Sequence, residues 1–276
     1  MGYVLMALGL TLVFGIGRVI NFAHGELYTL GAFIAVVLVQ ASFPYLSTLL
    51  IAPLLAGIMG MLIERLIIRK MRGAGTSIWA PFLATLALLV IFQSLYLIIF
   101  GPDPHILQNS FGYTSIDLFS LTVMGQDALI AGVSIIVVAA LIWFMHHTSY
   151  GAAMRAVSQD RDTALLMGVD VNAIYALTWY LGVALAALAG VLVTPEATVD
   201  PYIGRIVLLK GITIVIVGGL GSVEGAVLGG LMLGLIESLA GTYVSPSFKD
   251  GWGYALVILV LVFRPRGLLG QQLRRG

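Results

Sequence analysis

Cysteine is absent from this chain of 276 residues, and charge is scarce. Without a thiol, disulfide bonds, thiolate metal sites and cysteine nucleophiles are excluded. Only 10% of the residues are charged and 60% are hydrophobic, with a mean hydropathy of +1.05, whereas a soluble domain has about 25% charged residues. The composition therefore predicts a protein of the lipid bilayer, and the net charge of +1 gives no sign of a nucleic-acid partner.

Two motifs for catalysis are also missing. No Gly-Lys-Ser/Thr sequence of a phosphate loop occurs, so the glycines between positions 218 and 225 indicate turns and not ATP binding. No Gly-x-Ser-x-Gly nucleophile elbow occurs either. His146 and His147 lie near a helix end, and no set of residues has the spacing of a metal site. We therefore expect no enzyme activity, no cofactor and no metal in this chain.

The hydrophobic residues form nine runs. We expect all of them to be helices, because lipid leaves no water for unpaired backbone groups, and the runs lack the alternation of a membrane barrel. At about 20 residues per crossing, they predict an all-α, polytopic transmembrane bundle of about 8–9 membrane segments, forming one domain over residues 1–276. The runs are Met1–Ile16, Leu27–Val39, Leu46–Ile63, Ile78–Phe100, Ala128–Phe144, Ala173–Val193, Ile206–Val217, Ala226–Leu239 and Trp252–Phe263.

Glycine-broken hairpins join the first two runs (GIGRVINFAHGE) and the seventh and eighth (GGLGSVEG). Such pairs either cross fully or meet as half-helices inside the membrane. The two hairpins look alike, which indicates either an internal repeat or two independent cases of close packing. Small residues at Gly182, Ala186 and Gly190, and at Gly230 and Gly234, also favour close helix contacts. The N-terminal run has no basic leader, so we do not expect a removable signal peptide.

Lysine and arginine in short loops predict which side faces the cytoplasm. Eleven of the fourteen basic residues fall in one alternating set of loops, which we therefore place inside, together with the C-terminus; the N-terminus is then outside. The inside set is Arg18, Arg65, Arg69, Lys70, Arg72, Arg155, Arg161, Arg264, Arg266, Arg274 and Arg275, and the outside set is Arg205, Lys210 and Lys249. The longest external loop, Gly101–Asp127, contains no basic residue.

The most polar stretch of the chain, GAAMRAVSQDRDTALLMG at Gly151–Gly168, lies in the inside set. Asp160–Met167 has helix-forming residues with an apolar side made by Ala164, Leu165 and Met167, and Gly168 is typical of a helix end. A plain connector is the alternative interpretation. In a chain with so few polar residues, a short amphipathic helix that docks a cytosolic subunit explains the stretch better.

Candidates for a solute pathway are the polar residues in or beside apolar runs: Asn21, His24, Glu26, Gln93 and Glu237. Ionisable groups at membrane depth are costly, so they should face a partner or an aqueous cavity. For the first three, helix capping is the alternative and the more common role, because Asn21 suits a cap and Glu26 suits a first helical turn. On the outside, Thr194–Arg205 is either a solvated loop or a docking surface for an extracytoplasmic protein.

Several of these stretches occur together in one known family. They are GRVINFAHGELYTLGAF (Gly17–Phe33), GAAMRAVSQDRDTALLMGVD (Gly151–Asp170), GGLGSVEGAVLGG (Gly218–Gly230) and FRPRGLLG (Phe263–Gly270). In this order, across essentially the whole chain, they resemble the permease subunits of bacterial branched-chain amino acid ABC importers, and among these the LivH type. Permeases of urea and amide importers share the INxAHGE pattern. Similar permeases carry more helix before the position of Met1.

The resemblance implies a permease of the bacterial inner membrane that forms the translocation pathway for leucine, isoleucine and valine. Its implied partners are two cytosolic ATPases that use the ATP, a second, identical or homologous permease, and an extracytoplasmic solute-binding protein. It implies that Gly151–Asp170 docks into the ATPase, with coupling residues Arg155, Asp160, Arg161, Asp162, Ala164, Leu165 and Gly168. A urea or amide permease and an ATP-independent secondary transporter or channel are the alternatives. An intramembrane enzyme would have only His24 and Glu26 as candidates.

Overall fold

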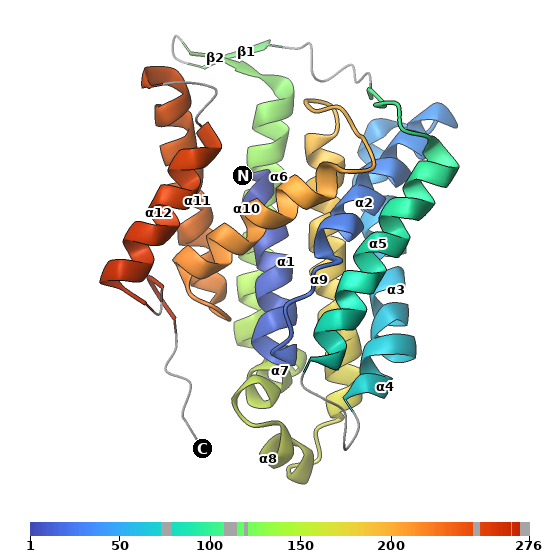
Figure 1. Cartoon of the computed structure of the whole chain (residues 1–276), viewed down its shortest axis with the longest axis vertical. Helices are drawn as coiled ribbons and strands as arrows, with labels where there is room; N and C mark the ends of the chain where they lie inside the picture. Colours follow the sequence, from blue (N-terminus) through green and yellow to red (C-terminus); the bar gives the residue numbers. More distant parts are fainter. Residues whose placement is uncertain (73–78, 108–114, 119–120, 245–248, 266, 271–276) are drawn as a thin grey trace.

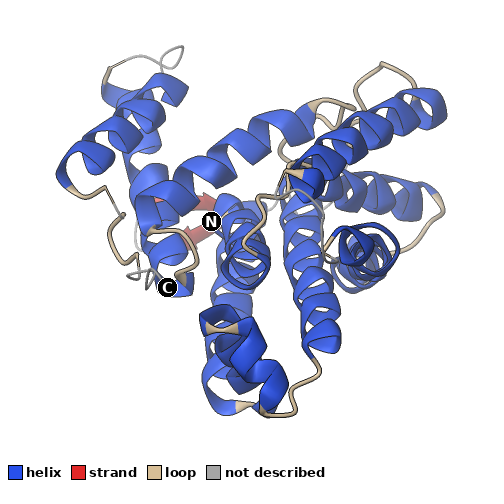
Figure 2. Cartoon of the chain, turned by 60° about the horizontal axis from the view of Figure 1, so that its bottom comes forward, coloured by secondary structure: helices blue, strands red, loops and turns tan. Residues whose placement is uncertain are grey.

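The computed structural model describes residues 1–72, 79–107, 115–118, 121–244, 249–265 and 267–270. Long helices run roughly along one direction and form a bundle (Figure 1), and helix makes up almost all of the described chain (Figure 2). In chain order the helices are α1 (Gly2–Gly17), α2 (His24–Gln40), α3 (Tyr45–Ile63), the π-helical turn η1 (Glu64–Ile68), α4 (Arg69–Met71), α5 (Ala80–Phe100), α6 (Gly125–His147), α7 (Ser149–Gln159), α8 (Arg161–Leu166), α9 (Val171–Val193), α10 (Ile203–Gly218), α11 (Val223–Tyr243) and α12 (Lys249–Phe263).

Over the described residues, each of the nine apolar runs coincides with a helix, apart from Met1 and Trp79, which directly precede α1 and α5. Five described helical segments are long and apolar enough to cross a bilayer: Tyr45–Met71, α5, α6, α9 and α11. The helices α1, α2 and Gly251–Phe263 are apolar but shorter. The number of 8–9 crossings therefore stays a prediction, whereas a multi-pass helical membrane protein is established.

The connection between α5 and α6 departs from the all-α prediction. It contains two short strands, β1 (Ser115–Leu118) and β2 (Leu121–Met124), which pair antiparallel with Leu118 opposite Leu121. The helix α6 follows directly at Gly125, so Asp127 belongs to its first turn and not to the loop. The sequence analysis missed the hairpin because it took Gly101–Asp127 as one irregular stretch.

Helices α1 and α9 form the centre of the bundle, and they meet at glycines. A Cβ added to Gly9 would collide with the carbonyl oxygen of Gly182, and one added to Gly190 would collide with that of Tyr28 on α2. The prediction of close packing at Gly182 and Gly190 is confirmed. For Gly234 it is wrong, since an added Cβ there would meet nothing within 4 Å.

Outward faces of the peripheral helices are apolar. On α5, for example, Val90, Ile91 and Ile98 are exposed, and this helix has no charged residue. Exposed aliphatic side chains of this density are unfavourable in water and favourable in hydrocarbon. These faces are therefore suited to contact with lipid tails.

The two glycine-broken hairpins differ in depth. After α1 ends at Gly17, residues 18–23 return along the bundle, and α2 begins beside the middle of α1, where His24 lies against Gly9. By contrast, α10 and α11 join in a tight turn, because Gly218 and Gly225 pack backbone to backbone. The first hairpin thus contains a helix, α2, that starts inside the bundle, whereas the turn of the second hairpin is closed by glycine contacts.

Candidate functional site

One end of the bundle carries α4, α7 and α8, and we name it the basic end (Figure 1). The sequence analysis predicted a single short helix here, but the structure has two. The missed helix, α7, is amphipathic and buries Met154 and Val157 against the bundle. It was missed because its many small and polar residues give the stretch little overall hydrophobicity, although Met154 and Val157 lie on one face.

Asp160 separates α7 from α8 and caps the second helix. Its carboxylate accepts hydrogen bonds from the backbone N–H groups of Asp162 (2.9 Å) and Thr163 (3.1 Å) and from the Thr163 hydroxyl (2.8 Å). These bonds, above all those from Thr163, hold the pKa of the Asp160 carboxyl below its usual value. The predicted helix Asp160–Met167 is thus confirmed in place, with Asp160 as its N-cap.

Gly168 ends this segment, as the sequence predicts. Its φ of +84° is a conformation that L-residues rarely adopt, and its N–H donates to the Leu165 carbonyl. Space is not the constraint, since an added Cβ would meet no atom within 4 Å. The identity of this residue therefore matters for backbone conformation alone.

The apolar residues of α8 divide between two directions. Ala164 is 4% exposed and packs on the bundle, whereas Leu165, Leu166 and Met167 are 55%, 87% and 80% exposed. The sequence analysis grouped Ala164 with Leu165 and did not single out Leu166, because a helical repeat does not say which part of an apolar side the bundle already covers. This exposed trio is an apolar surface at a polar end of the molecule.

Charged residues near α8 are exposed or half-buried, and one of them ties α7 to α1. Arg161 and Asp162 form an exposed ion pair with 3.4 Å between Nη1 and Oδ1, and Arg155 on α7 is half-buried. Arg18, at the end of α1, donates from Nη2 to the Ser158 carbonyl at 3.4 Å. The predicted coupling residues thus lie close together on α7, on α8 and in the turn after it, with Ala164 buried, and their coupling role stays a prediction.

A buried carboxylate, which the sequence analysis missed, anchors the neighbouring helices. Glu64 is fully buried and pairs with Arg69 (3.0 Å) and with Arg72. Arg69 also donates to the Asn172 carbonyl at 3.2 Å, and the Arg72 guanidinium lies 3.7 Å from the centre of the Tyr175 ring. This cluster holds the end of α3 against the first turns of α9. The sequence signal was an acidic residue just before four basic ones.

Asn21, His24 and Glu26 are all fully buried. The Asn21 side-chain oxygen accepts from Ala23 N at 3.1 Å, just ahead of α2, and Glu26 lies in the first turn of α2. His24 and Glu26 are two positions apart on the helix, so they point in different directions. Their side-chain nitrogen and carboxylate atoms have no hydrogen-bond partner among the described residues. Their assignment to a pathway stays a prediction.

Glu237 has the partner that its position in a helix requires. Lys210 on α10 donates to its two carboxylate oxygens at 2.9 and 3.0 Å, and the side chains are 12% and 5% exposed. The assignment of Lys210 and Arg205 to an external loop is wrong, because α10 begins at Ile203 and includes both. Gln93 lies half-buried on α5, one turn before Tyr96, whose hydroxyl donates to the Glu26 carbonyl at 2.7 Å.

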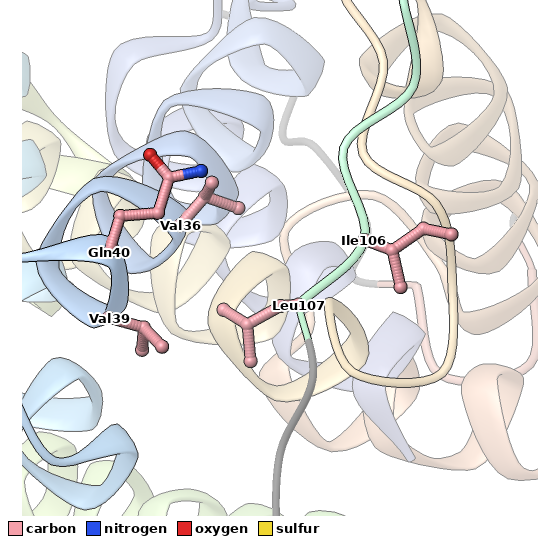
Figure 3. Close-up of a pocket in the computed structure, with 5 residues that line it drawn as sticks. All are labelled: Val36, Val39, Gln40, Ile106 and Leu107. Atoms are coloured by element: carbon pink, nitrogen blue, oxygen red, sulfur yellow. The ribbon is translucent and has the colours of Figure 1, made fainter. Parts of the chain in front are cut away.

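A cavity of about 260 Å³ opens at the end of α2 opposite the basic end (Figure 3). It is lined by Val36, Val39, Gln40, Ile106 and Leu107. None of the five predicted pathway residues lines it. Among the described residues, no group of three or more His, Asp or Glu side chains is placed to hold a metal ion.

At this opposite end, Thr194–Arg205 is not a free loop throughout. Val199 and His105 exchange two backbone hydrogen bonds of 2.8 Å, and α10 takes up the last residues. Partial desolvation raises the pKa of the Glu196 carboxyl, and the neighbouring Asp127 carboxylate raises it further. The segment is therefore tied to the α5–α6 connection and carries closely spaced acidic groups.

These features define a class: a multi-pass helical membrane protein with a capped, partly apolar helix displayed at a basic end. Comparison with known proteins gives the family. Residues 1–263 match the family described as the permease component of branched-chain amino acid transport systems, and the chain belongs to this family. It is a family of transport permeases and not of enzymes.

Relatives cover nearly the full length. The chain is 33% identical to the high-affinity branched-chain amino acid transport permease LivH of Salmonella typhimurium, over 98% of this chain and 91% of that protein. It is 33% identical to BraD of Pseudomonas aeruginosa (98% and 92%) and 29% identical to a probable LivH of Methanocaldococcus jannaschii (97% and 88%). No solved structure matches.

Proposed function

We propose that this protein is the permease subunit of an ATP-driven importer for leucine, isoleucine and valine in the bacterial inner membrane. The proposal rests on its family and on relatives whose names specify branched-chain amino acid transport. Relatives with other named substrates are more distant: a fructose permease is 26% identical. The comparisons thus favour branched-chain amino acids over the urea and amide alternative.

The exposed trio of α8 is the single structural observation that supports an ATPase partner. In this proposal Leu165, Leu166 and Met167 insert into a groove of a cytosolic ATPase, and burial in the partner compensates for their exposure. Each of two permeases contacts one ATPase, and ATP is bound and hydrolysed in those partners. A secondary transporter or channel would leave this apolar surface without a partner.

The sidedness follows from charge. The described basic residues Arg18, Arg69, Arg72, Arg155 and Arg161 gather at the basic end, and the rule for cytoplasmic loops places that end and the C-terminus inside. The acidic segment around Glu196 then faces outward, where a solute-binding protein delivers the amino acid.

Reconstitution tests the proposal. The permease, purified with the proteins encoded beside it, should retain an ATPase in mild detergent, and in proteoliposomes it should take up radiolabelled leucine only with ATP and the binding protein. Purification at full yield without any ATPase contradicts the proposal. Uptake driven by an ion gradient in the absence of ATPase would establish a secondary transporter instead.

A further inference from the structure

The course of α10 differs from that of the lipid-facing helices. It begins well below the upper ends of α6 and α9 and runs obliquely across the front of α1 (Figure 1). Its start packs on α2, because Gly204 and Gly25 touch through their backbones. Gly211, in its middle, lies against Met6 of α1. A large part of α10 therefore lies at membrane depth.

The outward face of α10 carries charged side chains beside apolar ones. Arg205 is exposed beside the exposed apolar residues Ile206 and Leu209, and Lys210 lies at the edge of the same face. The outward face of α5, by comparison, has no charged residue. Because an arginine facing hydrocarbon is strongly unfavourable, residues of this kind face water-filled cavities or partners.

The Lys210–Glu237 pair borders a narrow gap between α10, α11 and α12. Thr213, Leu233, Gly253 and Tyr254 line the gap together with the pair. Gly253 keeps it open, since an added Cβ would lie 2.9 Å from a Leu233 methyl carbon and 3.6 Å from a Glu237 oxygen. The Lys210 ammonium also lies 5.0 Å from the centre of the Tyr3 ring. Opposite charges and an apolar lining thus occur at one place.

Neither His24 nor Glu26 offers such a place. Both are completely buried inside the chain, and the described cavities do not reach them. The charged pair on α10 and α11, by contrast, retains some exposure. Of the ionisable side chains at membrane depth, the pair is therefore the better placed to meet a passing solute.

We propose that the outward face of α10 is a wall of the translocation pathway and that the Lys210–Glu237 pair receives the charged groups of a zwitterionic amino acid. This inference rests on the proposed importer function. When the pair separates, the Lys210 ammonium binds the solute carboxylate and Glu237 binds the solute ammonium group. Every charge then keeps an opposite partner, which is the condition for holding charges away from water. The aliphatic side chain of the solute contacts Leu233 and Tyr254.

Water access to α10 is tested first. Since the chain has no cysteine, single cysteines report accessibility without a background. In the complex in proteoliposomes, Leu209→Cys should react with a membrane-impermeant, charged methanethiosulfonate, and the rate should change when ATP is added. Ile91→Cys on α5 is the matched control, because the two native side chains are similarly exposed, at 46% and 52%. Reaction of Leu209→Cys no faster than that of Ile91→Cys in every nucleotide state overturns the pathway wall.

The role of the pair is tested by substitution in the complete importer. Lys210→Met with Glu237→Gln removes both charges, so it should keep the melting temperature while leucine uptake falls about tenfold or more, as expected for loss of charge-assisted bonds to the solute. The exchange Lys210→Glu with Glu237→Lys restores an ion pair but reverses its direction. Uptake should stay low in this variant.

A pair that only joins two helices gives the opposite result. In that case the exchanged variant would take up leucine at the wild-type rate, because it keeps an ion pair between α10 and α11. The neutral variant would also take up leucine at the wild-type rate as long as it stays folded. Either result overturns the solute contact. Failure of the proposed function is distinct, because in that case the wild-type importer itself takes up no leucine. The labelling of Leu209→Cys still decides whether α10 faces water.

Discussion

Leu166 offers the most direct test of docking through α8. Its side chain is 87% exposed in the permease alone, so truncation to alanine should leave the fold and its melting temperature unchanged. In the complex the same side chain is expected to be buried, and burying a leucine side chain contributes about 1.5–3 kcal/mol. Leu166→Ala should therefore weaken binding of the ATPase by about 2 kcal/mol, which is roughly a thirtyfold higher Kd. Leu166→Asp should weaken binding of the ATPase further, because the charged aspartate side chain would lose its water when the interface forms.

The measurement is the affinity of the purified ATPase for the permease in lipid nanodiscs, followed by ATP-driven leucine uptake with the complete importer. Leu50→Ala is the matched control: this leucine of α3 is 71% exposed on an apolar face, so the change should affect neither quantity. If Leu166→Ala and Leu166→Asp both bind the ATPase as tightly as wild type, the exposed trio is not a docking surface and α8 only connects α7 to α9.

Three further predictions follow from the geometry. Gly168→Val should strain the end of α8 by about 1–2 kcal/mol and reduce coupled uptake, whereas Gly168→Asn, which tolerates positive φ, should be milder; equal activity of both variants contradicts a backbone role. Gly25→Ala should prevent stable folding, because the added Cβ would collide with the Gly204 carbonyl. The control Gly132→Ala on α6, where space is open, should be neutral or stabilising by about 0.5–1 kcal/mol. Purified yield and melting temperature measure both effects, and a wild-type yield of Gly25→Ala would contradict the close packing. Since the pKa of Glu196 is raised, the folded state favours its protonated form, so the wild-type melting temperature should fall as pH rises above the ordinary value of 4.5. Glu196→Gln should remove that part of the pH dependence. Identical pH profiles of the melting temperature for wild type and Glu196→Gln would contradict this assignment.

The positions of the long helices follow from the sequence because hydrocarbon allows few alternatives. A continuous apolar run in lipid must satisfy its own backbone hydrogen bonds, so runs such as Ala173–Val193 become helices nearly residue for residue. Capping is equally local, which is why Asp160 and Gly168 were identified as the ends of α8. Where the chain is polar, as in α7, the same rule does not apply, and the helix was missed.

Partners across the fold were not predictable in the same way. Glu237 signalled that it needed a partner, but Lys210 lies 27 positions away across the turn between α10 and α11, and the positive-inside rule had placed it in a loop. The exposure of Leu166 likewise depends on which side of α8 the bundle covers. Both are properties of packing between helices, and one sequence read alone contains no direct signal for them.

If α8 docks an ATPase as proposed, the position of α9 gives a route from α8 to the centre of the molecule. Asp170 caps α9 four residues after α8 ends, by accepting from Ala173 N at 3.0 Å, so the two helices are joined by a very short connection. The first turns of α9 are fixed to η1 and α4 through the Glu64 cluster, and its middle and upper part pack on α1 and α2 through Gly182 and Gly190. Because close-packed helices do not compress, we expect a displacement of α8 that is passed to α9 to be shared with α1, α2 and α3, which pack closely on α9. Helices α11 and α12 stand outside this unit and meet it mainly through α1 and α10. We therefore expect relative motion between this unit and the α11–α12 pair to change the contact of α10 with α11, which Lys210 and Glu237 bridge.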